Sequence, residues 1–457
     1  MLKDMRSFLR LLEEKGDLVH ITEPVSPHYG VAAGMRKTSD LRGPALWFDN
    51  VIGASMPVVG ALYAHRRRAL WGLETTPERF FEKYMAGQQN PIPPRIVKDG
   101  PCKEVVITGD DVDLGKFPIC THNRLDAGPY ITMGLTIARH PRYGGNVSIS
   151  RMQLYDRQTL GIMSVPPQQI GVYFAEMEKE GKSLPMAVTI GNDPYTSFCS
   201  QVKGSIYLDE LSVAGGWMGE PVEVVPCETI DVAVPATSEI VLEGELVAGE
   251  RRLEGPFGEY PGYYSPATQR PVFRVKAITH RRDPIYLAGL TGMPTTDNHV
   301  MKQVPLEALL YSRLRQVCPT IRDVCVTDAG GGYHVVVSIR PTFATQARDV
   351  MLCALTTERL RPKLVIVVDE DIDPRDPHQV EWAMAFRFQA DRDAVIIPRT
   401  LGQTLDPSTP ALNVGSVLAI DATQPFGAGY GEVTVVPGAD EFVIPGWTDA
   451  AGKPTRG

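Results

Sequence analysis

The chain has 457 residues, 43% of them hydrophobic and 22% charged, which is the composition of a soluble globular protein with two or three domains. Its formal net charge of −8 argues against general nucleic-acid binding, since such proteins present a basic face to the phosphate backbone. The seven cysteines are scattered and include no C-x-x-C pair, which favours reduced thiols over a disulfide framework. No apolar run approaches the roughly 20 residues of a membrane helix, and the charged amino terminus lacks a signal-peptide core. We therefore expect a cytoplasmic protein.

Residues 1–110 predict an α/β amino-terminal domain. Apolar residues recur at helical spacing over residues 2–12, and Gly16 is well placed to end this helix. Leu18–Ile21 then has the pattern of a strand, and residues 22–110 mix short strands, prolines and helical stretches. The densest basic run, Arg66-Arg67-Arg68, is expected in a solvated loop or at a phosphate contact.

Residues 111–300 are rich in short β-type runs separated by glycine and proline turns, which predicts an antiparallel barrel. The clearest of these runs cover residues 130–138, 188–191, 222–225, 240–246 and 272–278.

From residue 301 to residue 457, helical and strand patterns alternate, which predicts a second α/β domain with a glycine- and proline-rich tail. Helices are expected over residues 306–317 and 375–390, a tight turn at Gly330-Gly331-Gly332, and a buried strand over residues 364–368. The predicted fold class is therefore mixed α+β.

The segment Leu-Glu-Gly-Pro-Phe-Gly-Glu-Tyr places Glu254 and Glu259 on either side of a turn. Pro256 restricts the backbone of this turn and the two glycines allow unusual conformations, so the carboxylates can be held in fixed directions. About a hundred residues earlier, Arg151 ends an alternating apolar run. Two acids and an arginine make a plausible set for proton transfer and carboxylate handling, although a surface turn with two solvated acids has the same pattern. Neither a His-Glu-x-x-His motif nor a Gly-x-Ser-x-Gly motif is present.

Both segments resemble the UbiD-type prenylated-FMN-dependent decarboxylases, which have N-x-S-x-x-R followed about a hundred residues later by E-G-P-x-G-E. The resemblance extends in family order from about residue 5 to about residue 425. It includes the amino-terminal helix and turn (residues 7–18), central strands (residues 219–225 and 235–244) and carboxy-terminal segments (residues 362–373 and 419–423). It implies a split flavin-binding barrel in the middle of the chain and a carboxy-terminal domain that assembles a homodimer or homohexamer.

The resemblance also implies a cofactor site that binds prenylated FMN through a metal-bridged phosphate. The implied cofactor contacts are Asn146, Ser148, Ile149, Ser150, Arg151, Gln168, Gln169 and Lys363. The implied metal ligands are Asn146, Gln169 and Glu210, whose oxygen atoms suit Mn²⁺ or Mg²⁺, with K⁺ close by. Many relatives have histidine at the position of Gln169, so the identity of the metal is left open.

The implied reaction is reversible, non-oxidative decarboxylation of an aromatic, heteroaromatic or α,β-unsaturated carboxylic acid. Arg151 is expected to pair with Glu254, and Glu259 is expected to donate the proton that replaces carbon dioxide, which requires a pKa raised by burial. His299 is expected near the substrate, although a lone histidine is also common as a structural residue. A flavin prenyltransferase is the expected cofactor supplier. The alternatives are a flavin reductase or electron-transfer flavoprotein, suggested by the barrel alone, and a non-catalytic subunit of a carboxylase complex.

Overall fold

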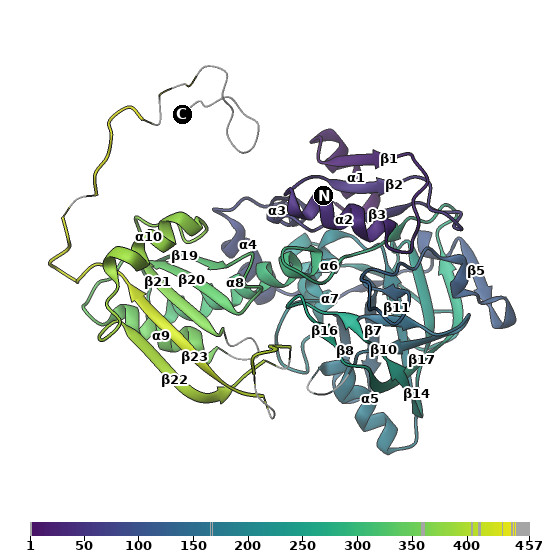
Figure 1. Cartoon of the computed structure of the whole chain (residues 1–457). Helices are drawn as coiled ribbons and strands as arrows, with labels where there is room; N and C mark the ends of the chain where they lie inside the picture. Colours follow the sequence, from purple (N-terminus) through teal and green to yellow (C-terminus); the bar gives the residue numbers. More distant parts are fainter. Residues whose placement is uncertain are drawn as a thin grey trace.

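The computed structural model describes residues 2–164, 166, 168–357, 362–403, 405–409, 413–431, 433–439, 442 and 444. Figure 1 shows an amino-terminal region packed on a central β-rich region, with the carboxy-terminal domain beside both. Within the described residues, no helix has the length and apolar character needed to cross a membrane.

The amino-terminal region is built on a sheet of strand order β1-β2-β3-β18, in which β1 and β2 are parallel. Its helices and first strands are α1 (Met5–Glu14), β1 (Leu18–Ile21), α2 (Gly30–Asp40), β2 (Ala45–Phe48), β3 (Val58–Gly60), α3 (Arg66–Gly72) and α4 (Phe80–Gln89). The predicted first helix is confirmed: Asp4 caps α1 by accepting from the Ser7 N–H, and the apolar residues of the pattern are buried. The strand β18 (Tyr286–Leu287) returns to this sheet from far along the chain, where it pairs with β3.

The basic run in α3 differs from its prediction. Arg68 is 1% exposed, and its guanidinium binds the carboxylate of Asp17 and backbone carbonyls of residues 43, 61 and 62. Arg67 makes a second pair of hydrogen bonds to the same carboxylate. The run is therefore a structural ion-pair cluster instead of a solvated loop, because a partner fifty residues earlier neutralises it.

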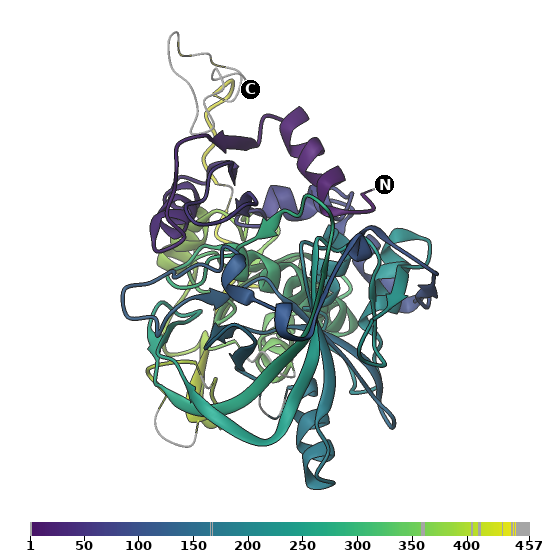
Figure 2. The same cartoon turned by 90° about the vertical axis from the view of Figure 1, so that its right-hand side faces the viewer.

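The central sheet has the strand order β6-β9-β10-β17-β14-β11-β7-β8, with β5 also paired to β17. Its strands are β5 (Val105–Thr108), β6 (Tyr130–Ile131), β7 (Leu135–His140), β8 (Gly144–Ile149), β9 (Met152–Leu154), β10 (Thr159–Ile162), β11 (Leu184–Ile190), β14 (Ile240–Glu254) and β17 (Thr268–His280). The neighbouring strands pair antiparallel, as predicted, and Figure 2 shows the long β14 and β17 curving across the molecule. One buried core extends from α1 through this sheet, so the amino-terminal and central regions fold around shared apolar side chains.

Smaller elements surround the central sheet. They are β4 (Arg95–Ile96), the 3-10 turns η1 (Pro101–Lys103), η2 (Gly109–Asp111) and η3 (Leu114–Lys116), α5 (Gln169–Lys179), α6 (Pro194–Cys199), α7 (Glu210–Met218), β12 (Glu223–Pro226), β13 (Ala233–Pro235), β15 (Phe257–Gly258) and β16 (Tyr264–Ser265). The run predicted at residues 222–225 is a strand, but it belongs to the separate sheet β13-β12-β4 and not to the barrel. Two strands pair across the predicted domain boundaries. The strand β5 lies before residue 110 but pairs with β17 of the central sheet. The strand β18 lies before residue 300 in the predicted central domain but pairs with β3 of the amino-terminal sheet.

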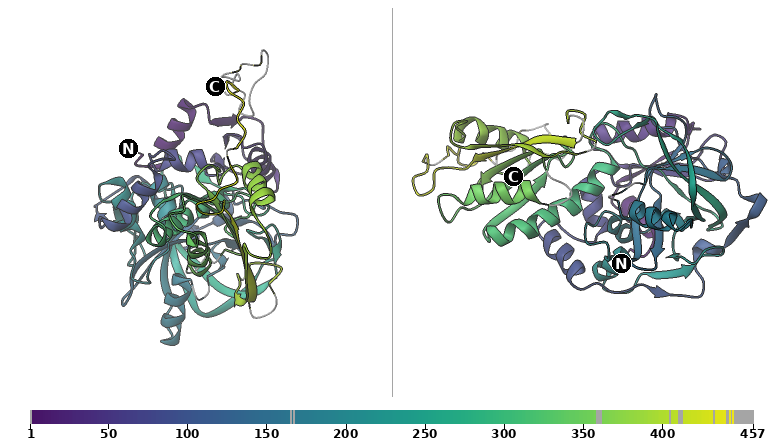
Figure 3. Two further views of the ribbon diagram at one scale, coloured as in Figure 1. Left: turned by 90° about the vertical axis from the view of Figure 1, so that its left-hand side faces the viewer. Right: turned by 90° about the horizontal axis from the view of Figure 1, so that it is seen from below.

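The carboxy-terminal domain has a sheet of order β19-β20-β21-β23-β22, seen beside the central region in Figure 3. Its elements are α8 (Asp297–Val317), β19 (Ile321–Val326), β20 (His334–Ile339), α9 (Gln346–Thr356), β21 (Leu364–Asp369), α10 (Pro377–Arg387), β22 (Ala394–Leu401) and β23 (Val414–Ala422). Alternate strand residues pack on α8 and α9 on one face and on α10 on the other. Because both faces are covered, β20 and β21 are almost continuously apolar. The predicted helix at residues 306–317 is the second half of α8, which begins nine residues earlier.

Candidate active site

The structure brings Arg151, Glu254 and Glu259 into direct contact. Arg151 lies in the short link between β8 and β9, and its Nε and Nη2 each donate to a Glu254 carboxylate oxygen over 2.9 Å. Its Nη1 forms an ion pair with Glu259 Oε1. The side chains are 8% exposed for Arg151, 0% for Glu254 and 13% for Glu259, so this is a buried site and not a pair of solvated acids. A bidentate arginine–carboxylate pair fixes the guanidinium plane, so both carboxylates have defined directions.

The turn between the two glutamates is anchored by side chains from other segments. Glu254 is the last residue of β14, and Gly255 follows it with φ +90°, a conformation that favours glycine. The N–H of Gly255 donates to Gln153 Oε1 over 3.0 Å, and the N–H of Gly258 donates to Asp126 Oδ1 over 2.8 Å. Thr291 Oγ1 donates to the carbonyl of Gly258 over 2.7 Å. These contacts explain why Glu259 is held beside Arg151.

The predicted metal ligands also meet. Asn146 on β8 donates from Nδ2 to Gln169 Oε1 over 2.9 Å and to Glu210 Oε1 over 3.0 Å. Gln169 begins α5 and Glu210 begins α7, so three elements contribute to one group of oxygen atoms. The second oxygen of Glu210 accepts from the N–H of Val147 over 2.9 Å.

This group fits a divalent cation. Asn146 Oδ1 is buried and has no hydrogen-bond partner among the described residues. On the other side of the same amide, Nδ2 faces Gln169 Oε1 and Glu210 Oε1. If the Asn146 side-chain amide were flipped, its oxygen would take the place of Nδ2 and face the oxygen atoms of Gln169 and Glu210. Three oxygen atoms that converge in this way need a cation between them. Burial raises the pKa of the Glu210 carboxyl to about 8, with a contribution from the charge of Asp209. A bound cation would offset the free-energy cost of burying the charged Glu210 carboxylate.

The remaining predicted cofactor residues lie at the edge of the same region. Ser148 faces Thr136 on β7, with 2.9 Å between the two hydroxyl oxygens. Ile149 ends β8 and packs against the main core, and Ser150 is buried directly before Arg151. Gln168 is the residue that precedes the first turn of α5. All four therefore flank the metal-ligand group or the arginine.

Lys363 lies apart from this group, in the carboxy-terminal domain. Its Nζ donates to Asp406 Oδ2 over 2.9 Å and also contacts Ser408. It borders a surface cavity of about 430 Å³ with Tyr333. Its phosphate contact stays a prediction, and it requires the ammonium to leave these partners.

His299 is placed in the first turn of α8 with both ring nitrogens engaged. Nδ1 lies 2.8 Å from Thr296 Oγ1, and Nε2 lies 2.8 Å from the carbonyl of Tyr260. The ring stacks on Tyr260 at 4.3 Å between centroids. Burial lowers the pKa of His299 to about 4, so the ring is neutral near pH 7. In this structure His299 therefore supports the residue that follows Glu259.

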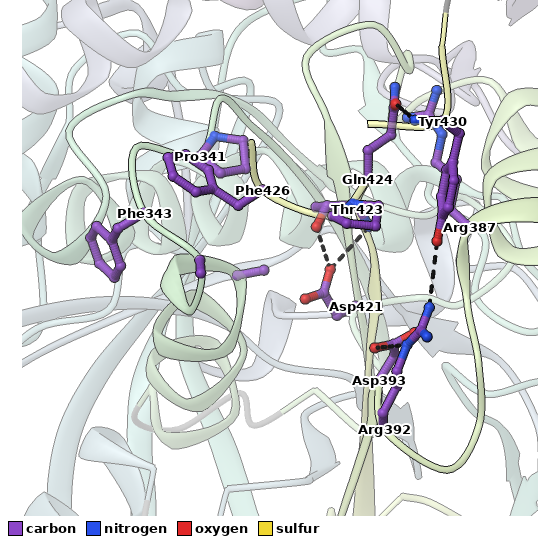
Figure 4. A pocket seen from close by; sticks show the side chains of 13 residues that line it. Pro341, Phe343, Arg387, Arg392, Asp393, Asp421, Thr423, Gln424, Phe426 and Tyr430 are labelled. Atoms are coloured by element: carbon purple, nitrogen blue, oxygen red, sulfur yellow. Dashed lines mark hydrogen bonds and ion pairs between the residues drawn. The ribbon is translucent and has the colours of Figure 1, made fainter. Parts of the chain in front are cut away.

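A further cavity of about 240 Å³ lies in the carboxy-terminal domain (Figure 4). Its charged groups pair with one another or with nearby residues: Arg392 with Asp393, Asp421 with Thr423, and Arg387 with Asp369 and Asp371. No arginine–diglutamate arrangement is found among the residues that line it, so it does not resemble the site around Arg151.

Several residues of the site were not predicted. Asp126, Gln153 and Thr291 hold the glutamate turn through bonds to its backbone. Their partners are 132, 102 and 33 residues away, so no local pattern could show them. Asp126 also accepts from the N–H of Asn123. This local turn is the one feature of the sequence that could have indicated a structural role for Asp126.

Three family models match the chain. The 3-octaprenyl-4-hydroxybenzoate carboxy-lyase N-terminal domain matches residues 9–86, the Rift-related domain residues 95–294, and the C-terminal domain residues 299–422. Solved structures agree with them. The UbiD-class enzyme HmfF from Pelotomaculum thermopropionicum, in complex with FMN, is 39% identical with a TM-score of 0.91, over 96% of this chain and 98% of that chain.

Two other structures extend the comparison. An evolved dimeric form of the same HmfF, in complex with prFMN, is 36% identical with a TM-score of 0.88, over 96% of this chain and 98% of that chain. The open form of vanillic acid decarboxylase from Sedimentibacter hydroxybenzoicus is 32% identical with a TM-score of 0.88, over 96% of this chain and 98% of that chain.

The fold and the buried arginine–diglutamate site together define a flavin-dependent carboxy-lyase, which confirms the predicted enzyme class and the mixed α+β fold. The chain belongs to the UbiD family. The family comparison does not support the alternatives of a flavin reductase or an electron-transfer flavoprotein.

Proposed function

We propose that the protein decarboxylates an aromatic or heteroaromatic carboxylic acid at Arg151, Glu254 and Glu259, with prenylated FMN bound beside them. The observation that carries this proposal is the buried guanidinium held between two carboxylates of one turn. The relatives whose names include vanillic acid decarboxylase, or whose structures contain FMN or prFMN, support the substrate class and the cofactor.

Prenylated FMN, when bound, supplies the electron sink that takes up the charge left by the departing carbon dioxide. Arg151 contributes a fixed positive charge in a site with little water, which favours binding of the substrate carboxylate and its loss as a neutral gas. Glu254 holds Arg151 in one orientation through two hydrogen bonds.

Glu259 is the proposed proton donor. Its carboxyl oxygen delivers a proton to the substrate carbon from which carbon dioxide has left, and it takes the proton back when the reaction runs as a carboxylation. The N–H of Tyr260 lies 3.2 Å from Glu259 Oε2, which holds the second oxygen while the first contacts Arg151.

Asn146, Gln169 and Glu210 would hold Mn²⁺ or Mg²⁺ against the cofactor phosphate, with K⁺ nearby. The orphaned oxygen of Asn146 supports this assignment. The amide oxygen of Gln169 replaces an imidazole nitrogen of many relatives, so we infer a weaker preference for transition metals than in those proteins. We also propose a homodimer or homohexamer, loaded with cofactor by a flavin prenyltransferase.

The test is production of the protein in cells with and without a flavin prenyltransferase. The expected product of co-production has a flavin-like spectrum, contains Mn²⁺ or Mg²⁺, and releases carbon dioxide from members of a panel of aromatic acids. Protein made without the prenyltransferase is the control and should release none. A folded, colourless, metal-free product of co-production without activity would refute the proposal.

A further inference from the structure

A buried tyrosine packs against the glutamate turn and has no role in the mechanism above. Tyr130 on β6 is 0% exposed and lies opposite Gln153 on β9. Its hydroxyl donates to Gln153 Oε1 over 3.1 Å, and the same oxygen accepts from the N–H of Gly255 at the start of the turn. Because Tyr130 is fully buried, its effect on a reaction must pass through the residues that it contacts.

The hydroxyl of Tyr130 faces acceptors that belong to the turn. Besides Gln153 Oε1, it lies 3.5 Å from the carbonyl of Pro256 and forms a hydrogen bond to the carboxylate of Glu254. Burial raises the pKa of this hydroxyl, and the charge of Glu254 raises it further, so the hydroxyl keeps its proton near pH 7. Tyr130 is therefore a donor to the turn, and the Glu254 carboxylate is one of the groups that it stabilises.

Gln153 is held in the orientation that this arrangement needs. Its Nε2 donates to the carbonyl of Ala127 over 3.4 Å, so Oε1 is the atom that faces Tyr130 and Gly255. An amide oxygen has two lone pairs, and the tyrosine hydroxyl and the glycine N–H use both of them. Gln153 thus couples the hydroxyl of Tyr130 to the main chain directly after Glu254.

The ring of Tyr130 supports Arg151 from a second direction. It packs on the ring of Phe257 with 4.4 Å between centroids, and Phe257 is buried as well. The guanidinium carbon of Arg151 lies 5.1 Å from the centroid of the Phe257 ring, which is a cation–π contact. Tyr130 therefore contacts two groups that fix Arg151: its hydroxyl binds the Glu254 carboxylate, and its ring packs on Phe257.

We propose that Tyr130 is a positioning residue for the reaction, which holds Arg151 in one orientation through Glu254 and Phe257. This inference rests on the proposed function. Arg151 has to stay in place while carbon dioxide leaves and a proton arrives, because small displacements of a charged group in a site lower the rate sharply. A tyrosine that only filled the core would contribute to folding, and its hydroxyl would have no effect on the bound flavin.

The experiment compares Tyr130→Phe with Glu254→Gln and with the double variant. Tyr155→Phe is the matched control, because Tyr155 donates over 2.9 Å to the carbonyl of Leu253, directly before Glu254. The control removes a tyrosine hydroxyl from the same strand end and leaves the donors of the carboxylate in place. Cofactor content, the absorption spectrum of the bound flavin, kcat, KM and urea unfolding are measured, and the spectra are recorded with FMN as well as with prenylated FMN.

Tyr130→Phe should bind flavin normally and lower kcat by about 10- to 100-fold, the effect of losing a hydrogen bond to a charged group, with a KM close to that of wild type. Its flavin spectrum should shift in the same direction as that of Glu254→Gln. The double variant should be no slower than Glu254→Gln alone, because both changes act through one carboxylate. Tyr155→Phe should match wild type.

A wild-type spectrum and kcat in Tyr130→Phe overturn the inference, whether or not urea unfolds this variant more easily. So does a double variant in which the two losses of rate multiply, since changes at independent sites add in free energy. Equal effects of Tyr130→Phe and Tyr155→Phe also overturn it. If wild type turns over no acid, the proposed function fails, while the FMN spectra still decide whether Tyr130 acts on Arg151.

Discussion

Arg151 divides its hydrogen-bonding edges between the two glutamates of one turn. Nε and Nη2 face Glu254, and Nη1 faces Glu259, so the two acids are not equivalent. Glu254 is fully buried and bidentate, which suits a residue that fixes the arginine. Glu259 is partly exposed and binds through one oxygen, which suits a residue that exchanges a proton with substrate.

The change Glu254→Gln should therefore affect the cofactor as well as the reaction. Glutamine removes the charge and one acceptor oxygen, so the guanidinium loses its fixed plane and its counterion. We expect turnover to fall at least about 10²-fold, together with a shift in the absorption spectrum of the bound flavin. Spectra and rates of Glu254→Gln and Glu259→Gln, measured side by side, check this. An unaltered spectrum in Glu254→Gln with normal turnover would contradict the role given to Glu254.

His299 gives the fold a dependence on pH. Its folded pKa of about 4 lies below the ordinary value of 6.5, so between these values the unfolded chain binds a proton that the folded chain does not. Stability therefore falls as pH falls through this window, by roughly 2 kcal/mol at pH 5. Urea unfolding of wild type and His299→Gln at pH 7.5 and pH 5 measures this loss of stability. His378→Gln, a change at an exposed histidine, is the control. The difference in the free energy of unfolding between the two pH values should be smaller by roughly 2 kcal/mol in His299→Gln alone. An equal difference in all three proteins would show that His299 is not the group responsible.

At the scale of elements, two helix starts and one strand meet at the site. The start of α5, the start of α7 and the middle of β8 bring Gln169, Glu210 and Asn146 together. The glutamate turn then follows β14 and is fixed by Asp126 and Thr291. Function in this region therefore depends on how the two helix starts and the glutamate turn are placed against β8.

The change Glu210→Gln should remove the metal. Glutamine keeps the shape but loses the only carboxylate of the predicted ligand set, and a hard divalent cation needs that charge. We expect at least a tenfold loss of bound Mn²⁺ or Mg²⁺ and poor retention of the flavin after gel filtration, measured by elemental analysis and absorbance. Glu245→Gln, a change at a partly exposed acid that pairs with Lys276 far from the ligand set in the chain, is the control. Full metal content in Glu210→Gln would exclude Glu210 as a ligand.

The sequence predicted the glutamate turn and its arginine, because each lies in a short motif. The grouping of Asn146, Gln169 and Glu210 was implied by the family resemblance, and the structure brings these side chains together. It missed the first turns of α8, and the physical reason is burial of polar residues. Asp297 accepts from the N–H of Tyr63, 234 residues earlier, and His299 binds the carbonyl of Tyr260, 39 residues earlier. Polar residues satisfied by such distant partners interrupt the apolar periodicity that signals a helix.

At the scale of the whole molecule, Glu307 on α8 ties the regions together. It binds Arg66 from α3 and Arg375 from the segment before α10, and Arg375 also binds Asp323 on β19. Burial alone would raise the pKa of the Glu307 carboxyl, but the charges of Arg375 and Arg66 hold it below its ordinary value. The carboxy-terminal domain is thus linked electrostatically to the amino-terminal region through α8, the helix that also carries His299.

We expect the carboxy-terminal domain to assemble the chain into a dimer or hexamer. Phe386 on α10 and Ile396 on β22 are exposed apolar side chains of this domain that an interface between copies of the chain would cover. A relative is described as an evolved dimeric form. Light scattering at micromolar concentration should therefore give a mass of two or six times 50.2 kDa. A stable monomer under these conditions would contradict the prediction.

The most direct test of the central claim is the behaviour of Glu259→Gln in D₂O. Protein is loaded with prenylated FMN, and carbon dioxide release and deuterium incorporation into the product are followed together. Glutamine keeps the hydrogen-bonding reach of Glu259 but cannot donate a proton near neutral pH. The account predicts cofactor content close to that of wild type, with both rates lower by at least about 10²–10⁴-fold. Near-normal decarboxylation and near-normal deuterium incorporation in Glu259→Gln would contradict it.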